Sequence, residues 1–223
     1  MSDDTRARTI AGHPAARRVV DVADRRIVVW VVPELERLVD RDALLRGDAE
    51  PPYWAYLWSG ARVLASYLAR GFLDVRGRRV LEIGCGLALP GITAALLGAD
   101  VTLVDLDPAP LAFAAASAAA NGIDCRTVAS DFTRLDPAER YDVVLAAEVA
   151  YDRARYPELA AVLTRHRTPG GVTLLADGYR TDTRGLYRAL ADAGCATHAV
   201  DVRIEEEARA MPVRLTLIRC GGG

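Results

Sequence analysis

Apolar residues recur along most of this 223-residue chain with two periods, one typical of strands and one typical of helices. Short runs of apolar and β-branched residues predict strands at 79–83, 101–104, 125–129, 141–146 and 171–176. Between them, apolar positions three or four residues apart, punctuated by Pro or Gly, predict helices at 61–69, 90–97, 108–120, 157–165 and 183–193. Two final strands, 197–205 and 213–219, have no helix between them and predict a hairpin.

This alternation predicts the fold class. Strands separated by helices form parallel βαβ units, so we expect an α/β, Rossmann-like, doubly wound and mainly parallel sheet of seven strands. The terminal hairpin adds one antiparallel strand near the C-terminus.

The first fifty residues have a weaker pattern. We expect residues 1–18 to be a mobile arm, residues 19–21 and 26–32 to form a short hairpin that turns at Ala23-Asp24, and residues 33–45 to form a short helix. Residues 1–50 are therefore predicted to be an extension packed on the core, and residues 51–223 to be one domain.

Charge and composition narrow the function classes. Hydrophobic residues make up 51% of the chain, the formal net charge is −2 and the pI is about 6.0. A protein that binds many phosphates usually has an excess of basic residues, so we expect no nucleic-acid partner. All 28 basic residues are arginine, so no lysine can act as a base or form a Schiff base. No apolar run is long enough to span a bilayer and the first residues do not resemble a signal peptide, so we expect a cytoplasmic protein without a membrane partner.

The four cysteines, at 85, 125, 195 and 220, are scattered. They form no C-x-x-C pair and have no matching His spacing. We therefore expect neither a zinc site nor any other metal site, and no disulfide framework.

Candidate chemistry lies where the predicted parallel strands end, because ligands of such sheets bind outside the carboxyl ends of the strands. After strand 79–83, Gly84 and Gly86 allow a tight turn and a close approach of backbone to a ligand. A dinucleotide-binding turn needs a third small residue at position 89, where this chain has Leu89 followed by Pro90. The turn therefore suits a ligand without a pyrophosphate, and an oxidoreductase is the least favoured reading.

Acidic residues follow the next strands. Asp105, about twenty residues after the glycines, is placed to accept hydrogen bonds from both hydroxyls of a ribose, and Asp107 to cap the helix that begins at Pro108. Asp131 and Phe132 form a carboxylate–aromatic pair that can hold an adenine through its exocyclic amine and its face. Glu148 ends an apolar strand, where an unpaired carboxylate would be costly to bury.

These sites, in this order, resemble the class I, seven-strand S-adenosylmethionine-dependent methyltransferases. The run Pro51-Pro52-Tyr53-Trp54-Ala55-Tyr56-Leu57-Trp58-Ser59-Gly60 resembles the entry segment of the family 16 lysine methyltransferases. The likeness is strongest to the electron-transfer-flavoprotein β-subunit lysine methyltransferase branch, whose run is P-Y-W-A-x-x-W-P-G, with Ser59 in place of that Pro. The acid-x-x-Tyr motif of the branch is matched by Glu148 and Tyr151, and its Gly-Asp-Pro-Gly-Arg is partly matched by residues 176–180.

The resemblance implies an N-methyltransferase that uses S-adenosyl-L-methionine, yields S-adenosyl-L-homocysteine and acts on lysine side chains of a protein. It implies roles for ten residues. The cofactor-binding ones are Trp58, Gly84 and Gly86 at the methionine end, Glu82 through water or amine contacts there, Asp105 at the ribose, Asp131 and Phe132 at the adenine, and the backbone of Ala147. Glu148 and Tyr151 would line the acceptor channel and act in catalysis.

Other readings stay open. A small-molecule N-methyltransferase, acting on a nicotinamide-like or other amine, would use the same fold and cofactor site. A methyltransferase-like binding module would lack catalysis. The run Glu50-Pro51-Pro52-Tyr53 nearly matches the N/D-P-P-Y motif of enzymes that methylate nucleic-acid amines, but its first residue is Glu and it lies before the glycine turn.

Overall fold

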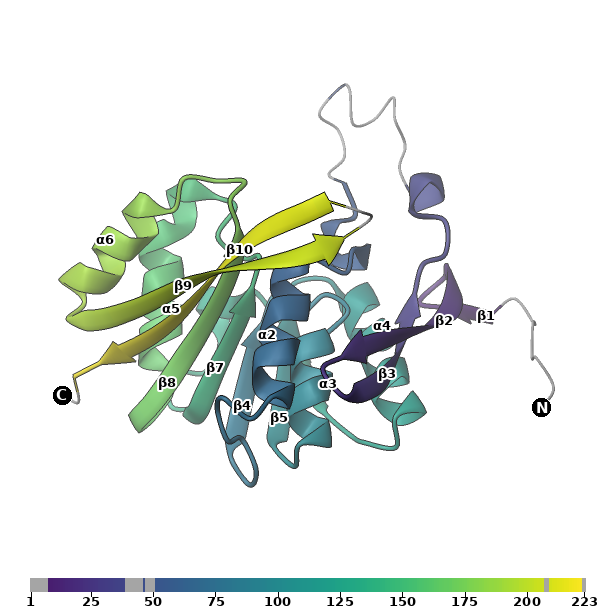
Figure 1. Cartoon of the computed structure of the whole chain (residues 1–223), viewed down its shortest axis with the longest axis horizontal. Coiled ribbons are helices and arrows are strands. Elements are labelled where there is room, and N and C mark those ends of the chain that lie inside the picture. Colours follow the sequence, from purple (N-terminus) through teal and green to yellow (C-terminus); the bar gives the residue numbers. More distant parts are fainter. Residues whose placement is uncertain (1–7, 39–45, 47–50, 207–208, 222–223) are drawn as a thin grey trace.

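The seven-stranded sheet predicted from the sequence is present. The structure is a computed structural model that describes residues 8–38, 46, 51–206 and 209–221. The strands lie in the order β6-β5-β4-β7-β8-β10-β9 (Figure 1). Their bounds are β4 (Arg79–Ile83), β5 (Asp100–Asp105), β6 (Arg126–Ala129), β7 (Tyr141–Ala147), β8 (Arg167–Gly178), β9 (Cys195–Glu206) and β10 (Arg209–Cys220). β10 runs antiparallel to both of its neighbours, which confirms the predicted antiparallel strand and the predicted hairpin.

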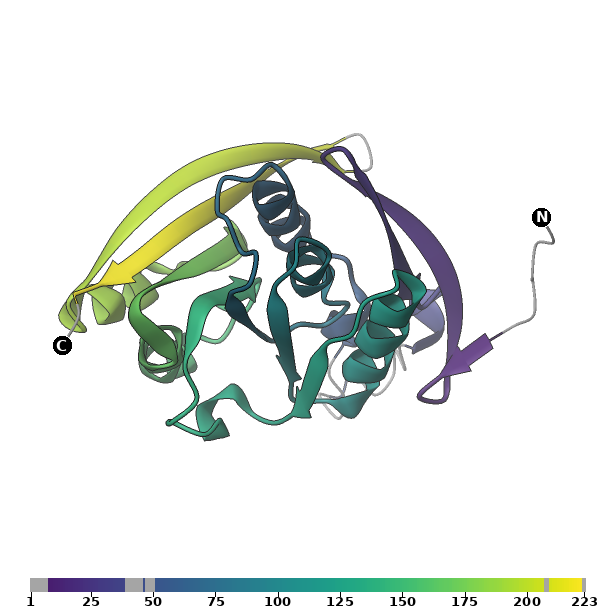
Figure 2. The same cartoon turned by 90° about the horizontal axis from the view of Figure 1, so that it is seen from below.

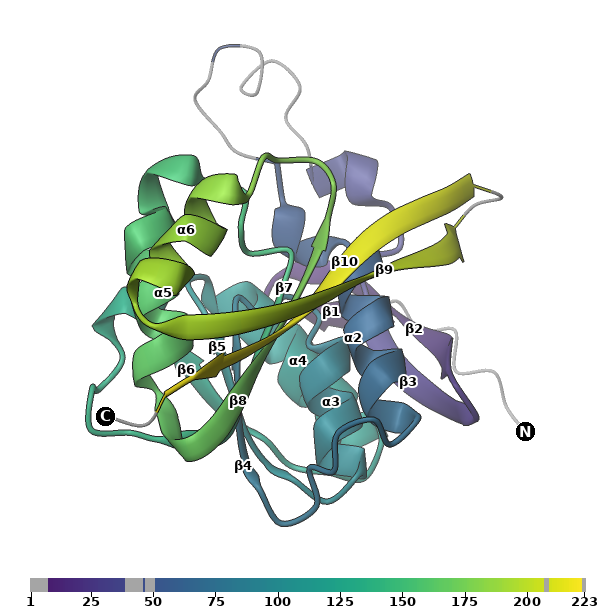
Figure 3. The ribbon, with the colours of Figure 1, turned by 60° about the vertical axis from the view of Figure 1, so that its left-hand side comes forward.

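Helices cover both faces of this sheet. The face that carries Val80 and Leu103 packs against α2 (Ser59–Ala69), α3 (Leu89–Leu96) and α4 (Pro108–Ala120). The opposite face, which carries Leu81 and Val104, packs against α5 (Tyr156–Arg165) and α6 (Arg184–Asp192), as Figure 3 shows. Successive strand residues therefore point into two separate cores, which is why the central strands are apolar on both faces.

In the described part of the chain there are also four short 3-10 helices: η1 (Leu35–Leu38), η2 (Tyr53–Ala55), η3 (Phe132–Arg134) and η4 (Arg153–Arg155). The described part of the predicted helix 33–45 is η1, and residues 39–45 lie outside the described residues. Asp107 caps α4 by accepting a hydrogen bond of 2.8 Å from the backbone NH of Ala109, so its predicted capping role is confirmed.

A second, three-stranded sheet precedes the main one. It consists of β1 (Arg8–Ile10), β2 (His13–Val22) and β3 (Arg25–Val31), so the predicted hairpin is confirmed. The prediction of a mobile arm is wrong for residues 8–18, which form β1 and most of β2, while residues 1–7 lie outside the described residues. Strand pairing orders this segment although few of its side chains are buried.

The small sheet is attached to α4. The NH of Trp30 donates to the hydroxyl of Ser117 at 2.8 Å, and the side-chain amide of Asn121 both accepts from and donates to the backbone of Val28. Figure 2 shows the β2–β3 ribbon and the β9–β10 ribbon curving over the α2 side of the molecule from opposite ends. The small sheet is therefore packed on α4 of the core, and the predicted boundary between residues 50 and 51 stays a prediction.

Cys195 and Cys220 form a disulfide, so the expectation of no disulfide framework fails for this pair. The two residues are direct partners in the register of β9 and β10, a relationship that spacing along the sequence does not reveal. Cys85 is buried and Cys125 half-buried, and both are free thiols.

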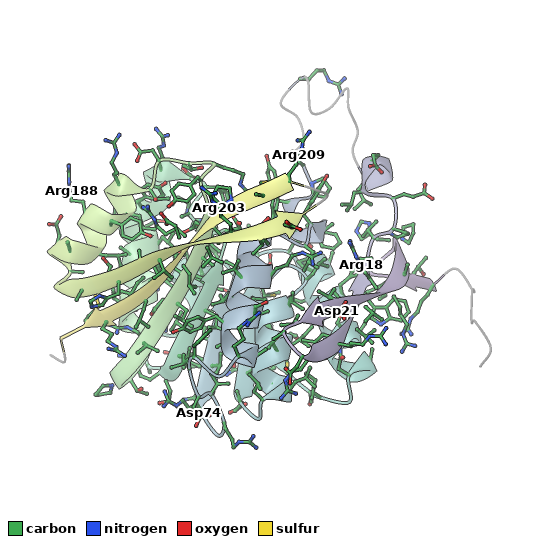
Figure 4. All side chains as sticks on the ribbon, in the orientation of Figure 1. Arg18, Asp21, Asp74, Arg188, Arg203 and Arg209 are labelled. Atoms are coloured by element: carbon green, nitrogen blue, oxygen red, sulfur yellow. A yellow bond between two sulfur atoms is a disulfide. The ribbon has the colours of Figure 1, made fainter. Side chains whose placement is uncertain are left out.

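The outside of the molecule carries the charges. Figure 4 shows Arg18 and Asp21 on β2, Arg203 on β9 and Arg209 on β10, all of them exposed.

Among the described residues no helix is both long enough and apolar enough to cross a membrane. The same residues include no group of three or more His, Cys, Asp or Glu side chains that could hold a metal ion.

Candidate functional site

One pocket opens at the carboxyl ends of four adjacent strands, β6, β5, β4 and β7. β4 lies between β5 and β7, at the topological switch point where the strand order reverses direction. Ligands of doubly wound sheets bind at this position. Nine of the ten predicted site residues line the pocket: Trp58, Gly84, Gly86, Asp105, Asp131, Phe132, Ala147, Glu148 and Tyr151.

The glycine turn and Asp105 are in direct contact. The backbone NH of Gly86 donates to Oδ2 of Asp105 at 2.8 Å, and the NH of Asp107 reaches Oδ1 at 3.4 Å. Gly84 and Gly86 have φ of +57° and +49°, which favour glycine. Burial raises the pKa of Asp105. The turn and the carboxylate therefore form one surface rather than two separate ends of a cleft.

Glu82 does not line the pocket, so its predicted contact with the methionine end is wrong. Its side chain is buried beneath α3, where Oε2 accepts a hydrogen bond of 2.8 Å from the backbone NH of Gly91. Burial raises the pKa of Glu82 to about 8, and the nearby Asp105 adds to this effect. Leu81 and Ile83 point to the α5–α6 core, so the alternation of the strand directs Glu82 to the other side.

The aromatic entry segment lies across the mouth of the pocket. η2 carries Tyr53 and Trp54, and the Trp58 indole NH donates to the carbonyl of Tyr53 at 2.9 Å. The ring of Trp54 packs 5.3 Å from that of Phe113, between centroids. A Cβ at Gly86 would lie 3.0 Å from the carbonyl oxygen of Trp54, so the segment rests directly on the glycine turn.

Asp131 and Phe132 both line the pocket, and the side chain of Arg155 contacts both of them. Asp131 accepts hydrogen bonds from the NH and the hydroxyl of Thr133, and Arg155 binds both of its carboxylate oxygens at 2.9–3.0 Å. Burial raises the pKa of Asp131, but these hydrogen bonds outweigh it and hold the pKa below its usual value. The guanidinium carbon of Arg155 lies 4.7 Å from the centre of the Phe132 ring. The adenine contact therefore stays a prediction, with Arg155 as an added member of this part of the site.

Glu148 has an unusual backbone and a buried side chain. Its φ is +58°, a left-handed conformation that costs a non-glycine residue about 1–2 kcal/mol. Oε1 accepts from the NH of Gly60 at 3.0 Å and Oε2 from the NH of Gly178 at 3.1 Å, and Arg180 pairs with Oε2. Strained residues of this kind concentrate at functional sites, where surrounding contacts hold them in place.

Aromatic side chains surround the pocket mouth beside Glu148. Tyr53, Tyr56 and Tyr151 are half or more exposed. The ring of Tyr53 lies 6.5 Å from that of Tyr151, and the ring of Tyr56 lies 5.1 Å from that of Trp58. We call Tyr53, Tyr56, Trp58 and Tyr151 the aromatic rim.

A buried acid lies on the next strand. Asp177, near the end of β8, is 8% exposed. Burial raises its pKa to about 7, with a further contribution from the negative charge of Glu148.

Sequence reasoning missed Arg155, Arg180 and Asp177. Arg155 meets an acid 24 residues earlier, and Arg180 meets one 32 residues earlier. Only the partial match at residues 176–180 pointed to the region of Asp177 and Arg180.

Comparisons with known proteins agree with this geometry. Residues 80–171 match a family model described as a methyltransferase domain. The chain is 36% identical over 129 residues to protein N-lysine methyltransferase METTL21A of Danio rerio, covering 54% of this chain and 58% of that protein. It is 31% identical over 104 residues to the electron transfer flavoprotein beta subunit lysine methyltransferase of Danio rerio, covering 46% and 40%. The chain thus spans less than two thirds of these relatives.

The solved structures give the same fold. The crystal structure of an S-adenosylmethionine-dependent methyltransferase from Clostridium acetobutylicum matches with a TM-score of 0.56 and 13% identity, covering 81% of this chain and 96% of that one. The matched domain, the relatives and the seven-stranded sheet together make this chain similar to the class I, seven-strand S-adenosylmethionine-dependent methyltransferases, and among them to the family 16 lysine methyltransferases.

Proposed function

We propose that this protein transfers the methyl group of S-adenosylmethionine to a nitrogen atom, and that the acceptor is a lysine side chain of another protein. The observation that carries the proposal is the contact between Gly86 and Asp105 inside a pocket lined by four adjacent strand ends. A close backbone turn beside a carboxylate suits the ribose of a nucleoside.

The pocket also fits a cationic cofactor. Besides Asp105, its lining includes the carboxylates of Asp131 and Glu148, with Arg155 as the single basic residue among the lining side chains. When bound, S-adenosylmethionine supplies a methyl group on a positively charged sulfur, which a neutral amine accepts by in-line displacement with release of S-adenosylhomocysteine. Asp105 would hold the ribose, and the backbone of Gly84 and Gly86 would admit the methionine portion.

The acceptor amine must be neutral before it reacts. For a lysine with a pKa near 10.4, deprotonating the amine near pH 7.4 costs about 4 kcal/mol. Desolvation in a pocket and a neighbouring positive charge both lower that cost. Glu148 would orient the incoming amine, and the aromatic rim would shield it from water. Glu148 raises the pKa of a nearby amine, so orientation rather than proton removal is its proposed task.

The pocket mouth supports a protein acceptor over a small molecule. Tyr53, Tyr56 and Tyr151 are 51%, 50% and 69% exposed, so the rim faces solvent and is accessible to a protruding side chain. A small amine is usually enclosed by its site.

A labelling experiment tests the proposal. The full chain is incubated with methyl-tritiated S-adenosylmethionine and a cell lysate, and label is compared in protein, RNA and small-molecule fractions. Hydrolysis of the protein fraction should yield labelled methyl-lysine, which cannot come from the side chains of this enzyme because it contains no lysine. Label confined to small molecules would identify the second reading. Absence of cofactor binding at millimolar concentration, measured by calorimetry, would identify a binding module and overturn the proposal.

A further inference from the structure

Arg180 lies against two residues of the pocket. It follows β8, and its guanidinium pairs with Oε2 of Glu148. The same guanidinium lies over the ring of Trp58, with its central carbon 4.0 Å from the ring centre. Glu148 and Trp58 both line the pocket that Gly84, Gly86 and Asp105 form. A cationic side chain of the protein itself therefore covers one side of the candidate acceptor region.

The two members of this ion pair differ in how firmly they are held. The Glu148 side chain is 5% exposed and is fixed by the backbone NH groups of Gly60 and Gly178. The Arg180 side chain is 47% exposed and lies in the loop between β8 and α6. A half-exposed arginine regains water when it leaves its partner, and the two backbone NH groups stay on the carboxylate, so both limit the cost of separating the pair. The carboxylate is thus a fixed feature, and the guanidinium is the replaceable one.

The position that Arg180 fills has a definite chemistry. A buried carboxylate oxygen offers a charge-assisted hydrogen bond, and the face of a tryptophan ring attracts a cation. Together they select a cationic nitrogen group at the end of an aliphatic chain, as in lysine or arginine. The rim tyrosines Tyr53, Tyr56 and Tyr151 extend the same kind of surface outward.

We propose that the guanidinium of Arg180 occupies the position of the acceptor's cationic group, and that an acceptor enters by displacing Arg180 from Glu148 and Trp58. This inference rests on the proposed function and specifies its acceptor as a cation. Arg180 competes with the acceptor, so the apparent affinity for an acceptor is lowered by the fraction of molecules in which Arg180 is in place.

The experiment measures cation binding directly, without methyl transfer. The full chain is labelled with ¹⁵N, and the indole NH of Trp58, assigned with Trp58→Phe, is followed by NMR. The probes are n-butylammonium, ethylguanidinium and the neutral n-butanol, titrated at constant ionic strength. In Arg180→Ala, we expect half-saturation at about tenfold lower concentration of either cation than in the wild type. The cation with the larger gain indicates whether the position is suited to lysine or to arginine.

Matched variants separate displacement from a structural effect. Arg184→Ala removes an exposed arginine near the start of α6, which pairs with Asp182, and should bind the cations as the wild type does. Adding Glu148→Gln to Arg180→Ala should abolish the gain. Arg180→Gln, which keeps most of the side chain without its charge, gives the same test if the alanine variant does not fold.

Two results would overturn the inference: equal or weaker cation binding in both Arg180 variants, or an equal gain for n-butanol. Calorimetry with S-adenosylmethionine is run on the same samples. Loss of cofactor binding in the wild type would refute the proposed function, whereas the indole titration tests Arg180 regardless of that outcome.

Discussion

The backbone NH of Gly86 donates a hydrogen bond of 2.8 Å to the carboxylate of Asp105, a residue that lies 19 positions further along the chain. Gly86 lies in the turn after β4, Asp105 is the last residue of β5, and these strands are parallel neighbours. The contact therefore depends on the register of the sheet. It fixes the carboxylate at the turn, where a ribose would bind.

Replacing Asp105 tests its assigned role. Asp105→Asn keeps an oxygen that can accept from Gly86 but loses the second acceptor and the charge. Because hydrogen bonds to charged groups contribute about 1.5–3 kcal/mol, we expect affinity for S-adenosylmethionine to fall by about 10- to 100-fold in calorimetry. Asp107→Ala is the control, since the side chain of Asp107 caps α4 outside the pocket lining and the variant keeps the backbone NH that reaches Asp105. It should cost about 1 kcal/mol of stability and leave the affinity unchanged. Equal affinity in Asp105→Asn and wild type would contradict the ribose assignment.

Adding a methyl group at Gly86 tests the close approach of the entry segment. Gly86 and Gly71 both have positive φ, but a Cβ at Gly86 would lie 3.0 Å from the carbonyl oxygen of Trp54, whereas a Cβ at Gly71 would have nothing within 4 Å. Both alanine variants pay about 1–2 kcal/mol for the left-handed backbone. Gly86→Ala should lose about 1–3 kcal/mol more in urea unfolding and should also bind cofactor more weakly. If the two variants are equally stable, the segment does not press on the turn.

Much of this site could be predicted from the sequence, because parallel strands place their carboxyl ends at one edge. Gly84, Asp105, Asp131 and Glu148 each follow an apolar run that is long enough to be recognised as a strand. The order of the four runs along the chain, together with the rule that ligands bind beyond strand ends, suffices to bring them together.

The remaining features of the site and fold could not be predicted, because they depend on contacts between segments that are distant in sequence. The family resemblance assigned Glu82 to the methionine end of the ligand, but the direction of its side chain is set by which face of β4 packs on α3. The roles of Arg155 and Arg180 arise because η4, after β7, and the loop after β8 both return to acids of the pocket. The disulfide between Cys195 and Cys220 follows only from the register of β9 and β10.

The buried Glu82 predicts a pH dependence of stability. The pKa of this carboxyl is raised by burial from 4.5 to about 8 in the folded protein. Below pH 4.5 this carboxyl is protonated in both the folded and the unfolded state, so its burial costs no charge. As the pH rises from 4.5 toward 8, the carboxyl ionises in the unfolded state but stays protonated in the folded state, so the free energy of unfolding falls. We expect the free energy of unfolding of the wild type to fall by roughly 3 to 5 kcal/mol between pH 5 and pH 8 relative to Glu82→Gln.

Urea unfolding of the wild type and Glu82→Gln at several pH values measures how the free energy of unfolding of each changes with pH. Thr93→Val serves as a control, because it removes another buried polar group, whose hydroxyl donates to Leu89 at 2.7 Å, without changing a titratable residue. It should lower stability by a similar amount at every pH. Parallel pH profiles for the wild type and Glu82→Gln would show that Glu82 is ionised in the folded protein.

Tyr151 provides the sharpest test of the aromatic rim as part of the acceptor site. It is 69% exposed and lines the pocket beside Tyr53, so its removal should change the free energy of unfolding by no more than about 0.5 kcal/mol. A cation–aromatic contact contributes about 1 kcal/mol, so Tyr151→Ala should raise the acceptor KM about fivefold with unchanged cofactor affinity. Tyr151→Phe keeps the ring and should retain most of this binding if the face of the ring is what the acceptor contacts. Phe72→Ala, an equally exposed aromatic outside the pocket lining, should leave both constants unchanged. Steady-state transfer to the acceptor identified by labelling measures all three variants, and a wild-type KM in Tyr151→Ala would remove Tyr151 from the acceptor site.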